Sequence, residues 1–169
     1  MAIIDLIDIS NTKDVSKHLD KIAIQHIDDA ELVDIKPLLG EKLFLDMVAN
    51  ASDAKYLELL NGGNYEYDNF TFSHPGIKRV LIEFAYARIT FFGNEKSTPF
   101  GLVEKNYQDG RAITRDRAKE RYKASQQIAL QLWFDVKAFL DRKTKEYEYW
   151  NCSQGTKGML SGFKLKHIR

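Results

Sequence analysis

The sequence is poor in the residues that build covalent or metal-held frameworks. Cys152 is the only cysteine among the 169 residues, which excludes an internal disulfide and a multi-cysteine metal site. The four histidines are His18, His26, His74 and His167, and no two have the spacing of ligands on one metal-binding helix. We therefore predict no metal site and no cofactor. A single cysteine is typical of a protein from a reducing cytoplasm.

Long apolar runs, leader signals and catalytic motifs are also missing. No run of about 18 apolar residues occurs, so we predict no membrane span and no membrane partner. Met1–Asp5 has neither the basic region nor the apolar stretch of a signal peptide. Gly155-Thr156-Lys157-Gly158 lacks the spacing of a Walker phosphate loop. Because no nucleophile, base or metal pattern emerges, we predict that the protein is not an enzyme.

The strongest positive pattern lies in the last third of the chain. From Thr114 to Lys145, apolar residues recur at alternating spacings of four and three without Gly or Pro, which is typical of an amphipathic helix. The stripe consists of Ala118, Tyr122, Ser125, Ala129, Leu132, Val136 and Phe139, widened by Ile128, Trp133 and Leu140. We predict one long helix over about 114–145, followed by a tail rich in Gly, Ser and Lys.

Most of the remaining sequence also favours helices. The segment Pro75–Phe92 carries apolar residues around most of a helix circumference, which predicts a central buried helix. Alternating aromatic residues on both sides of Asp68-Asn69 predict a small β-hairpin over about 65–72. The predicted fold class is therefore mainly α: a helical bundle with one long C-terminal helix, a small β-hairpin and an extended C-terminal tail. Residues 1–146 form the predicted helical domain, and residues 147–169 form a tail for partner contacts.

Element boundaries follow from capping and turn residues. Asp28 and Glu31 match a capping box, which predicts a helix start at Asp28 and an extended link over Ile22–Ile27 before it. Pro75 suits the first position of the next helix. The segment Lys96–Gly110 is predicted to be a loop.

Two polar residues of the central segment have structural interpretations. His74, next to Pro75, is predicted to belong to a helix cap. Glu83 lies on the mostly apolar helix, so we expect it to be the acid that can be buried. Its expected partner is Arg79, Arg88 or a group on another element.

The net charge of +1 conceals an asymmetry between the two parts of the chain. Residues 1–110 contain 11 Lys/Arg and 18 Asp/Glu, a net charge of −7, whereas residues 111–169 contain 14 and 6, a net charge of +8. An acidic front and a basic back can attract each other within one chain or head-to-tail between copies. The alternative is ordinary surface charge that happens to be unevenly distributed.

The residues predicted to contact partners lie in the basic part of the chain. Basic residues are densest from Arg111 to Lys123, where they suit either phosphate groups or an acidic neighbour, or simply form a solvated helix face. Aromatic residues in the polar tail make sense if a partner orders them, the alternative being a disordered chain end. The candidate interface residues are Arg111, Arg115, Arg117, Arg121, Tyr147, Tyr149, Trp150 and Phe163.

Several segments, taken in order, resemble a known group of proteins. They are Asp34-Ile35-Lys36-Pro37-Leu38-Leu39-Gly40-Glu41, Leu59-Leu60-Asn61-Gly62-Gly63 with the aromatic hairpin, Ala85-Tyr86-Ala87-Arg88, Thr98-Pro99-Phe100-Gly101, and the long helix with its Tyr/Trp end. Over roughly residues 25–150 the chain resembles the head–tail connector (adaptor, or head completion) proteins of tailed bacteriophages. The nearest type is that of Bacteroides phages and crAss-like phages.

The resemblance implies a structural virion protein that forms a ring, commonly of twelve copies, beneath the portal. Such a ring joins the phage head to the tail, extends the DNA channel and touches the portal protein and tail or further ring proteins. It implies a location at the head–tail junction of the virion, and in the host cytoplasm during assembly. Non-specific contact with DNA in the channel is possible for such a ring. The alternative function is a nucleic-acid-binding packaging accessory that uses the basic long helix.

Overall fold

The computed structural model describes residues 3–13, 21–93, 95–98, 101–104 and 114–150. Within these residues the fold is mainly helical, as predicted from the sequence. The elements are α1 (Leu6–Thr12), α2 (Lys21–Asp29), the π-helical segment η1 (Ala30–Ile35), α3 (Lys36–Leu39), α4 (Glu41–Ala49), α5 (Ala54–Asn61), β1 (Gly63–Tyr67), β2 (Phe70–His74), α6 (Ile77–Phe92), β3 (Glu95–Thr98), β4 (Gly101–Glu104) and α7 (Arg115–Arg142).

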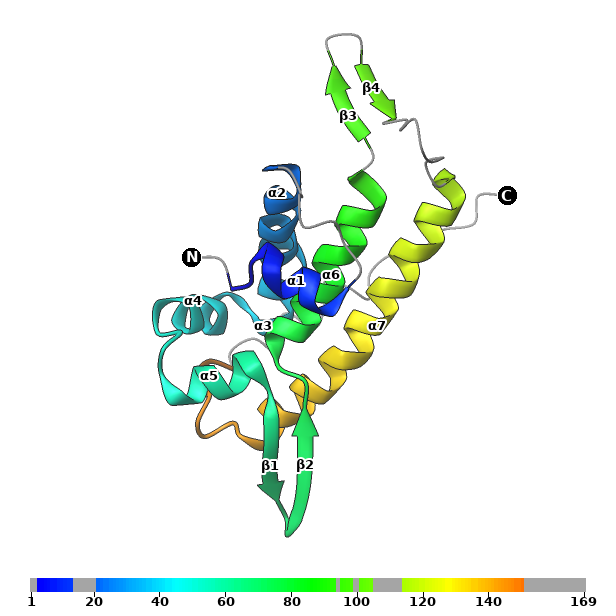
Figure 1. The fold of residues 1–169 in the computed structure, drawn as a ribbon. Coiled ribbons are helices and arrows are strands. Elements are labelled where there is room, and N and C mark those ends of the chain that lie inside the picture. The colour runs from blue at the N-terminus through cyan, green and yellow to red at the C-terminus, as the bar shows by residue number, and fades with distance from the viewer. Residues whose placement is uncertain (1–2, 14–20, 94, 99–100, 105–113, 151–169) are drawn as a thin grey trace, which may run out of the picture.

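Helix α6 occupies the centre of the fold, as its sequence predicts. It packs along α7 on one side, and α1, α2, η1 and α5 pack against it elsewhere (Figure 1). Its buried residues cover most of its circumference: Ile77, Val80, Leu81, Ile82, Glu83, Phe84, Ala85, Ala87 and Ile89. A helix that is apolar nearly all round must be covered on several sides. The N-terminal helices and α7 provide that cover, and α6 separates them.

Helix α7 confirms the predicted long helix with slightly shorter bounds. It spans the 28 residues Arg115–Arg142, between the N-cap Thr114 and the C-cap Lys143, which corresponds to roughly 42 Å. Its inward face is the predicted stripe in most positions, with Ala118, Ser125, Ala129, Trp133, Val136, Phe139 and Leu140 buried. Ile128 departs from the prediction, because its side chain is 41% exposed. The apolar stripe of α7 is wider than the face that α6 covers, so Ile128 at its edge is left exposed.

The predicted β-hairpin is present as β1 and β2, which pair antiparallel with Tyr67 opposite Phe70. Asp68 and Asn69 form its two-residue turn with φ values of 51° and 63°, a conformation that Asp and Asn tolerate best among non-glycine residues. At the base of the hairpin, Gly62 and Gly76 have φ values of 78° and 77°. A Cβ atom on Gly62 would lie less than 3.0 Å from backbone atoms of residues 74–76, and one on Gly76 would lie less than 3.0 Å from backbone atoms of residues 60–62. Only glycine therefore fits at these two positions.

The N-terminal elements differ from the sequence prediction. Ile22–Ile27 is part of helix α2 rather than an extended link, and Asp28 lies inside that helix rather than capping a new one. Helix α2 passes directly into η1 and α3, whose second residue is Pro37. Proline cannot donate a backbone hydrogen bond, and a local π-helical register is one way for a helix to accommodate such a break. The capping box of this region is formed instead by Asp5 and Asp8 at the start of α1.

Two further boundaries were wrong. Residues 96–110 were predicted to be a loop, but β3 and β4 form a second antiparallel pair within the described part of this segment. Pro75 precedes α6 rather than opening it, because Gly76 is the N-cap. The segment 96–110 has no alternation of apolar and polar residues, so its sequence gave no strand signal.

The described body extends past the predicted boundary at Glu146. Tyr147 and Trp150 are 1% and 4% exposed and belong to the main hydrophobic core. The Tyr147 hydroxyl donates a hydrogen bond to the carbonyl of Lys55 over 2.6 Å, and Trp150 Nε1 donates to Asp141 over 2.8 Å. The first residues of the predicted tail therefore close the core beneath α5 and α7.

Candidate assembly surfaces

The N-terminal half of α7 is basic along both flanks of the buried stripe. Of the predicted interface residues, Arg115, Arg117 and Arg121 are exposed there, together with Lys119 and Lys123. The acidic residues Asp116 and Glu120 are exposed on the same stretch and dilute this positive charge. Further along the helix, Leu130 is 44% exposed and Phe134 is 66% exposed. The outer wall of α7 therefore combines a basic half with an apolar half.

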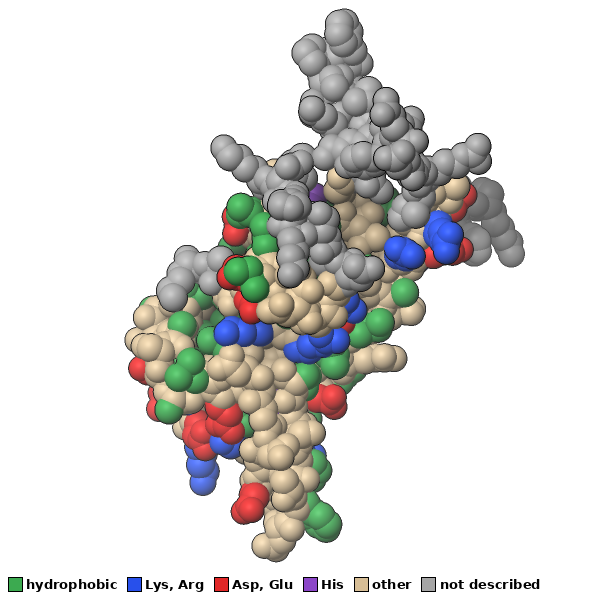
Figure 2. All heavy atoms as spheres, viewed as in Figure 1, with side chains coloured by type: hydrophobic (Ala, Val, Ile, Leu, Met, Phe, Trp, Pro, Cys, Tyr) green, Lys and Arg blue, Asp and Glu red, His purple; other side chains and the backbone are tan. Residues whose placement is uncertain are grey.

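The N-terminal helices, which contact α6 away from α7, have acidic and apolar surface. Five of their large apolar side chains are about half exposed or more: Ile7, Ile24, Leu32, Val33 and Leu45. A shallow cavity of about 340 Å³ lies between α1 and α2, lined by isoleucines and by the carboxylates of Asp5 and Asp28. Apolar side chains gather beside acidic ones over this part of the surface (Figure 2).

The predicted aromatic contacts of the tail are corrected by the burial of two residues. Tyr147 and Trp150 cannot offer their rings to a partner while they fill the chain's own core. Tyr149, between them, is 41% exposed and remains a candidate interface residue. Arg111 and Phe163 lie outside the described residues, as does Cys152.

The first hairpin is held to the end of α7 by one arginine. Arg142 donates a hydrogen bond from Nη1 to the Tyr65 hydroxyl over 2.6 Å. Its guanidinium carbon lies 3.8 Å from the centre of the Phe72 ring and 5.4 Å from that of Tyr67. A cation over an aromatic face is stabilised by the ring quadrupole. These contacts fix the direction in which the hairpin projects from the body (Figure 1).

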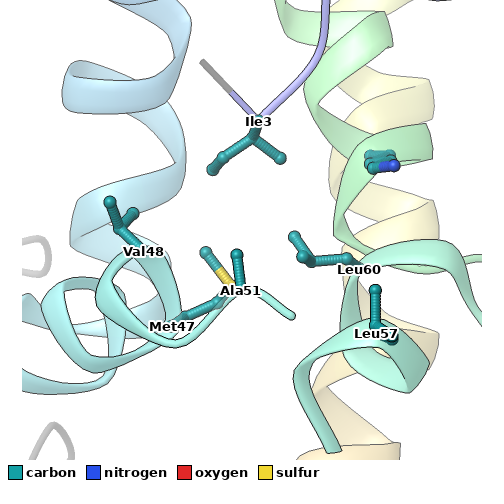
Figure 3. Close-up of a pocket in the computed structure, with 7 residues that line it drawn as sticks. Ile3, Met47, Val48, Ala51, Leu57 and Leu60 are labelled. Atoms are coloured by element: carbon teal, nitrogen blue, oxygen red, sulfur yellow. The ribbon is translucent and has the colours of Figure 1, made fainter. Parts of the chain in front are cut away.

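A small apolar pocket opens beside the start of α6. Ile3, Met47, Val48, Ala51, Leu57 and Leu60 converge on it from the N-terminus, α4 and α5 (Figure 3). Its volume is about 160 Å³, and Lys78 is the charged residue among those that line it. Sequence reasoning missed this pocket, because its walls come from three segments that each look like ordinary helix interior.

Two sets of ion pairs, one at Glu83 and one at Arg88, join elements of the body. Glu83 is fully buried, with Oε1 2.8 Å from Lys13 Nζ and 3.3 Å from Arg79 Nη2, so its predicted pairing with Arg79 is confirmed. Arg88 pairs instead with Asp34 at 2.9 Å. The Glu83 pair ties α1 to α6, which the sequence could not reveal.

His74 does not cap a helix. It ends β2, is 5% exposed, and its ring stacks on Phe139 with centroids 3.9 Å apart. Neither ring nitrogen has a hydrogen-bond partner within the described structure. Burial lowers the pKa of His74 below its ordinary value, with a further lowering from Lys143 opposed by Glu58 and Asp135.

The described residues offer neither a metal site nor a membrane-spanning element. No three of their His, Cys, Asp and Glu side chains are grouped so as to hold a metal ion. No helix among residues 3–13, 21–93 and 114–150 combines the length and apolarity that crossing a membrane requires.

Comparison with known proteins assigns a family without assigning an activity. Residues 35–158 match the family of unknown function DUF6712. This match covers more than half of the chain, and the protein belongs to that family. No curated protein and no solved structure shows significant similarity to the chain.

Proposed function

We propose that this protein is a structural subunit of a tailed-phage virion that forms a ring of twelve copies, in the manner of head–tail connectors, beneath the portal. The ring joins head to tail and extends the DNA channel. One observation carries the proposal: α6 separates a basic and apolar wall on α7 from an acidic and apolar surface on the N-terminal helices. Surfaces of opposite charge on different sides of one subunit suit heterologous contacts, which close into rings.

The exposed apolar residues strengthen this argument. Ile7, Ile24, Leu32, Val33 and Leu45 on one side, and Leu130 and Phe134 on the other, leave large side chains in water in an isolated chain. Contiguous exposed apolar surface marks protein interfaces, and Ile7 and Ile24 line one cavity. The sequence resemblance to connector proteins independently favours the same role, with the portal and tail or further ring proteins as neighbours.

The second candidate is a nucleic-acid-binding packaging accessory. Its support is the exposure of Arg115, Arg117, Lys119, Arg121 and Lys123 along two turns and more of one helix. Binding to phosphates through several such residues weakens steeply as salt rises. Asp116 and Glu120 on the same stretch favour a protein partner of mixed charge instead.

The decisive measurement is the mass of the purified protein, alone and with its candidate portal protein, by native mass spectrometry and light scattering. A ring, or a monomer that becomes a ring on the portal, supports the connector role. High salt should weaken the ring, because exposed charges attract less when screened. A protein that ignores the portal and binds duplex DNA with a steep salt dependence would move the assignment to the packaging accessory.

A matched pair of triple variants locates the contact. Arg115, Arg117 and Arg121 changed together to Glu should abolish assembly if the basic half of α7 meets an acidic neighbour. Asp116, Glu120 and Asp135, exposed on the same helix, changed together to Lys provide the control with reversed sign. Equal loss of assembly in both variants would argue against charge complementarity.

A further inference from the structure

The β1–β2 hairpin ends in an aromatic ring that the chain itself does not cover. Phe70 is 67% exposed, directly after the turn residues Asp68 and Asn69, and Asp68 is also exposed. The hairpin projects from the body, with apolar and acidic side chains visible along it (Figure 2). An exposed phenyl ring with a carboxylate two residues away is a compact unit for recognition.

The pocket beside Lys78 has the size and chemistry to receive such a unit. Its volume of about 160 Å³ is close to that of an engineered apolar cavity of about 150 Å³ that binds benzene. Met47 and Leu60, which are 1% and 5% exposed, line its interior, and Leu57 is 45% exposed. Lys78 can pair with an acidic group that accompanies the ring.

The hairpin of the same chain cannot enter this pocket. Its strands run five residues from Gly63 to Tyr67, which places the tip roughly 15 Å beyond the end of α5. Arg142 fixes the hairpin against α7 through Tyr65 and Phe72, so the tip cannot fold back onto α5. The occupant must therefore come from another molecule.

We propose that the pocket lined by Met47, Leu57, Leu60 and Lys78 receives Phe70 from the hairpin of a second copy, with Lys78 paired to Asp68. The inference rests on the proposed ring and names the contact that links neighbouring subunits. The contact is heterologous, because the hairpin tip and the pocket are different surfaces of one subunit. It therefore propagates around a ring without requiring two-fold symmetry.

Phe134 provides a stringent alternative within the same chain. It is 66% exposed and is followed by the exposed Asp135, so it resembles Phe70 in exposure and in its acidic neighbour. It lies, however, on the side of the continuous helix α7, whereas Phe70 lies beside the turn of a hairpin that projects from the body. The shape of the hairpin, rather than exposure alone, selects Phe70.

The first test compares Phe70→Ala with Thr71→Ala in otherwise intact protein. Loss of a ring buried at the centre of a contact should weaken self-association by about 30-fold or more. Thr71→Ala, the exposed next residue of the same strand, should change it by less than about threefold. Both positions are exposed in the monomer, so both variants should unfold at the denaturant concentration of the wild type. Unchanged association of Phe70→Ala would overturn the inference.

Cross-linking tests the contact directly. In a Cys152→Ser background, protein with Phe70→Cys is mixed with protein carrying Ala51→Cys at the edge of the pocket, under mild oxidation. Disulfide-linked pairs of the two variants are expected, whereas Phe134→Cys mixed with Ala51→Cys should give few. Equal yields in the two mixtures would overturn the inference.

The charge pair is tested with Lys78→Gln and Asp68→Asn, the latter chosen because asparagine also tolerates the positive φ of the turn. If the two side chains meet, the double variant should lose less than the sum of the single losses. Additive losses would contradict the pairing. A wild-type protein that stays monomeric with and without the portal would overturn the proposed function and this contact together. A wild-type ring that Phe70→Ala leaves intact would overturn the contact alone.

Discussion

The guanidinium carbon of Arg142 lies 3.8 Å from the centre of the Phe72 ring, while its Nη1 donates a hydrogen bond to Tyr65. This arginine is the last residue of α7, and the two aromatic residues face each other across β1 and β2. A two-stranded hairpin is only marginally stable alone in water. Its orientation on this protein therefore depends on contacts with α7, to which Arg142 contributes together with Phe139.

Arg142→Ala should loosen the hairpin without unfolding the helices. Removing a charged hydrogen-bond donor and its cation–π contacts is expected to cost about 1–3 kcal/mol. Amide hydrogen exchange of Tyr65 and Phe72 should accelerate more than that of residues in α6. Arg142→Lys keeps the charge but loses the planar guanidinium, so its exchange rates should fall between those of wild type and Arg142→Ala. Equal exchange rates in Arg142→Ala and wild type would show that the hairpin holds itself in place.

Lys13→Ala should destabilise the docking of α1 on α6. It removes the ammonium that lies 2.8 Å from the fully buried carboxylate of Glu83 and leaves Arg79 at 3.3 Å as its remaining ion-pair partner. Breaking a buried pair from one side costs about 3–5 kcal/mol, and the 20% exposure of Lys13 places the expected loss at the lower end. Denaturant unfolding measures it.

The matched variants for this pair are Glu83→Gln and the double variant. Because Glu83→Gln removes the buried charge that Lys13 helps to neutralise, Lys13→Ala combined with Glu83→Gln should be more stable than Lys13→Ala alone. A double variant that is less stable than both single variants would contradict the proposed cost of burying this carboxylate without Lys13.

Shortening the chain should separate the core from the segment that follows it. A chain that ends after Glu146 should be several kcal/mol less stable than one that ends after Trp150, because only the shorter chain loses Tyr147 and Trp150 from the core. Tyr147→Phe should lose only about 1 kcal/mol, since it removes the hydrogen bond to Lys55 and keeps the ring. Similar stability of the two shortened chains would place these rings outside the core.

His74 should make the fold less stable in mild acid. Burial lowers its pKa in the folded state below the ordinary value of 6.5, so the unfolded chain binds the proton more tightly. The stability that neutral His74 permits is present above pH 6.5 and is lost as the pH falls from there through the lower folded-state pKa. His74→Phe should therefore lose less unfolding free energy than wild type between pH 7.5 and pH 5.5. NMR titration of the His74 ring with a midpoint at or above 6.5 would contradict this account.

The titration of Glu31 changes stability with pH in the opposite direction to that of His74, so both proteins in the comparison must contain Glu31. Burial raises its pKa above the ordinary value of 4.5, with its hydrogen bond from Ile3 working against the shift. Its neutral form favours the fold, and this contribution is lost as the pH rises through the folded-state pKa. The difference between wild type and His74→Phe cancels this contribution, because both proteins contain Glu31.

Local sequence signals identified the elements that are complete within one segment. The helical period of α7, the all-round apolarity of α6 and the Asp68-Asn69 turn each depend on residues near one another in the chain, so pattern reasoning found them. The same reasoning misplaced Asp28, whose capping-box pattern is overridden by the continuation of α2 into η1. Capping residues favour a helix start, but the helix can continue through them when the residues before and after the motif are packed in helical conformation.

The candidate contact surfaces were predictable only in part. Arg115, Arg117 and Arg121 are exposed because they lie outside the apolar stripe of one helix, and the helical period of the sequence indicates that geometry. Tyr147 and Trp150 were misjudged, because nothing in their polar surroundings indicates that α5 supplies a carbonyl and α7 a ring and a carboxylate to receive them.

The sequence by itself determined the class of fold, the long helix, the first hairpin and the division of charge, since each of these is a property of composition or of short-range period. Only the tertiary structure decided that Glu83 is neutralised by Lys13 from α1, that Arg142 holds the hairpin, and that three segments enclose a ring-sized pocket beside Lys78. The physical reason is that such groups meet through contacts between residues distant in the chain. Their spacing along the sequence therefore contains no record of the distance between them in the folded protein.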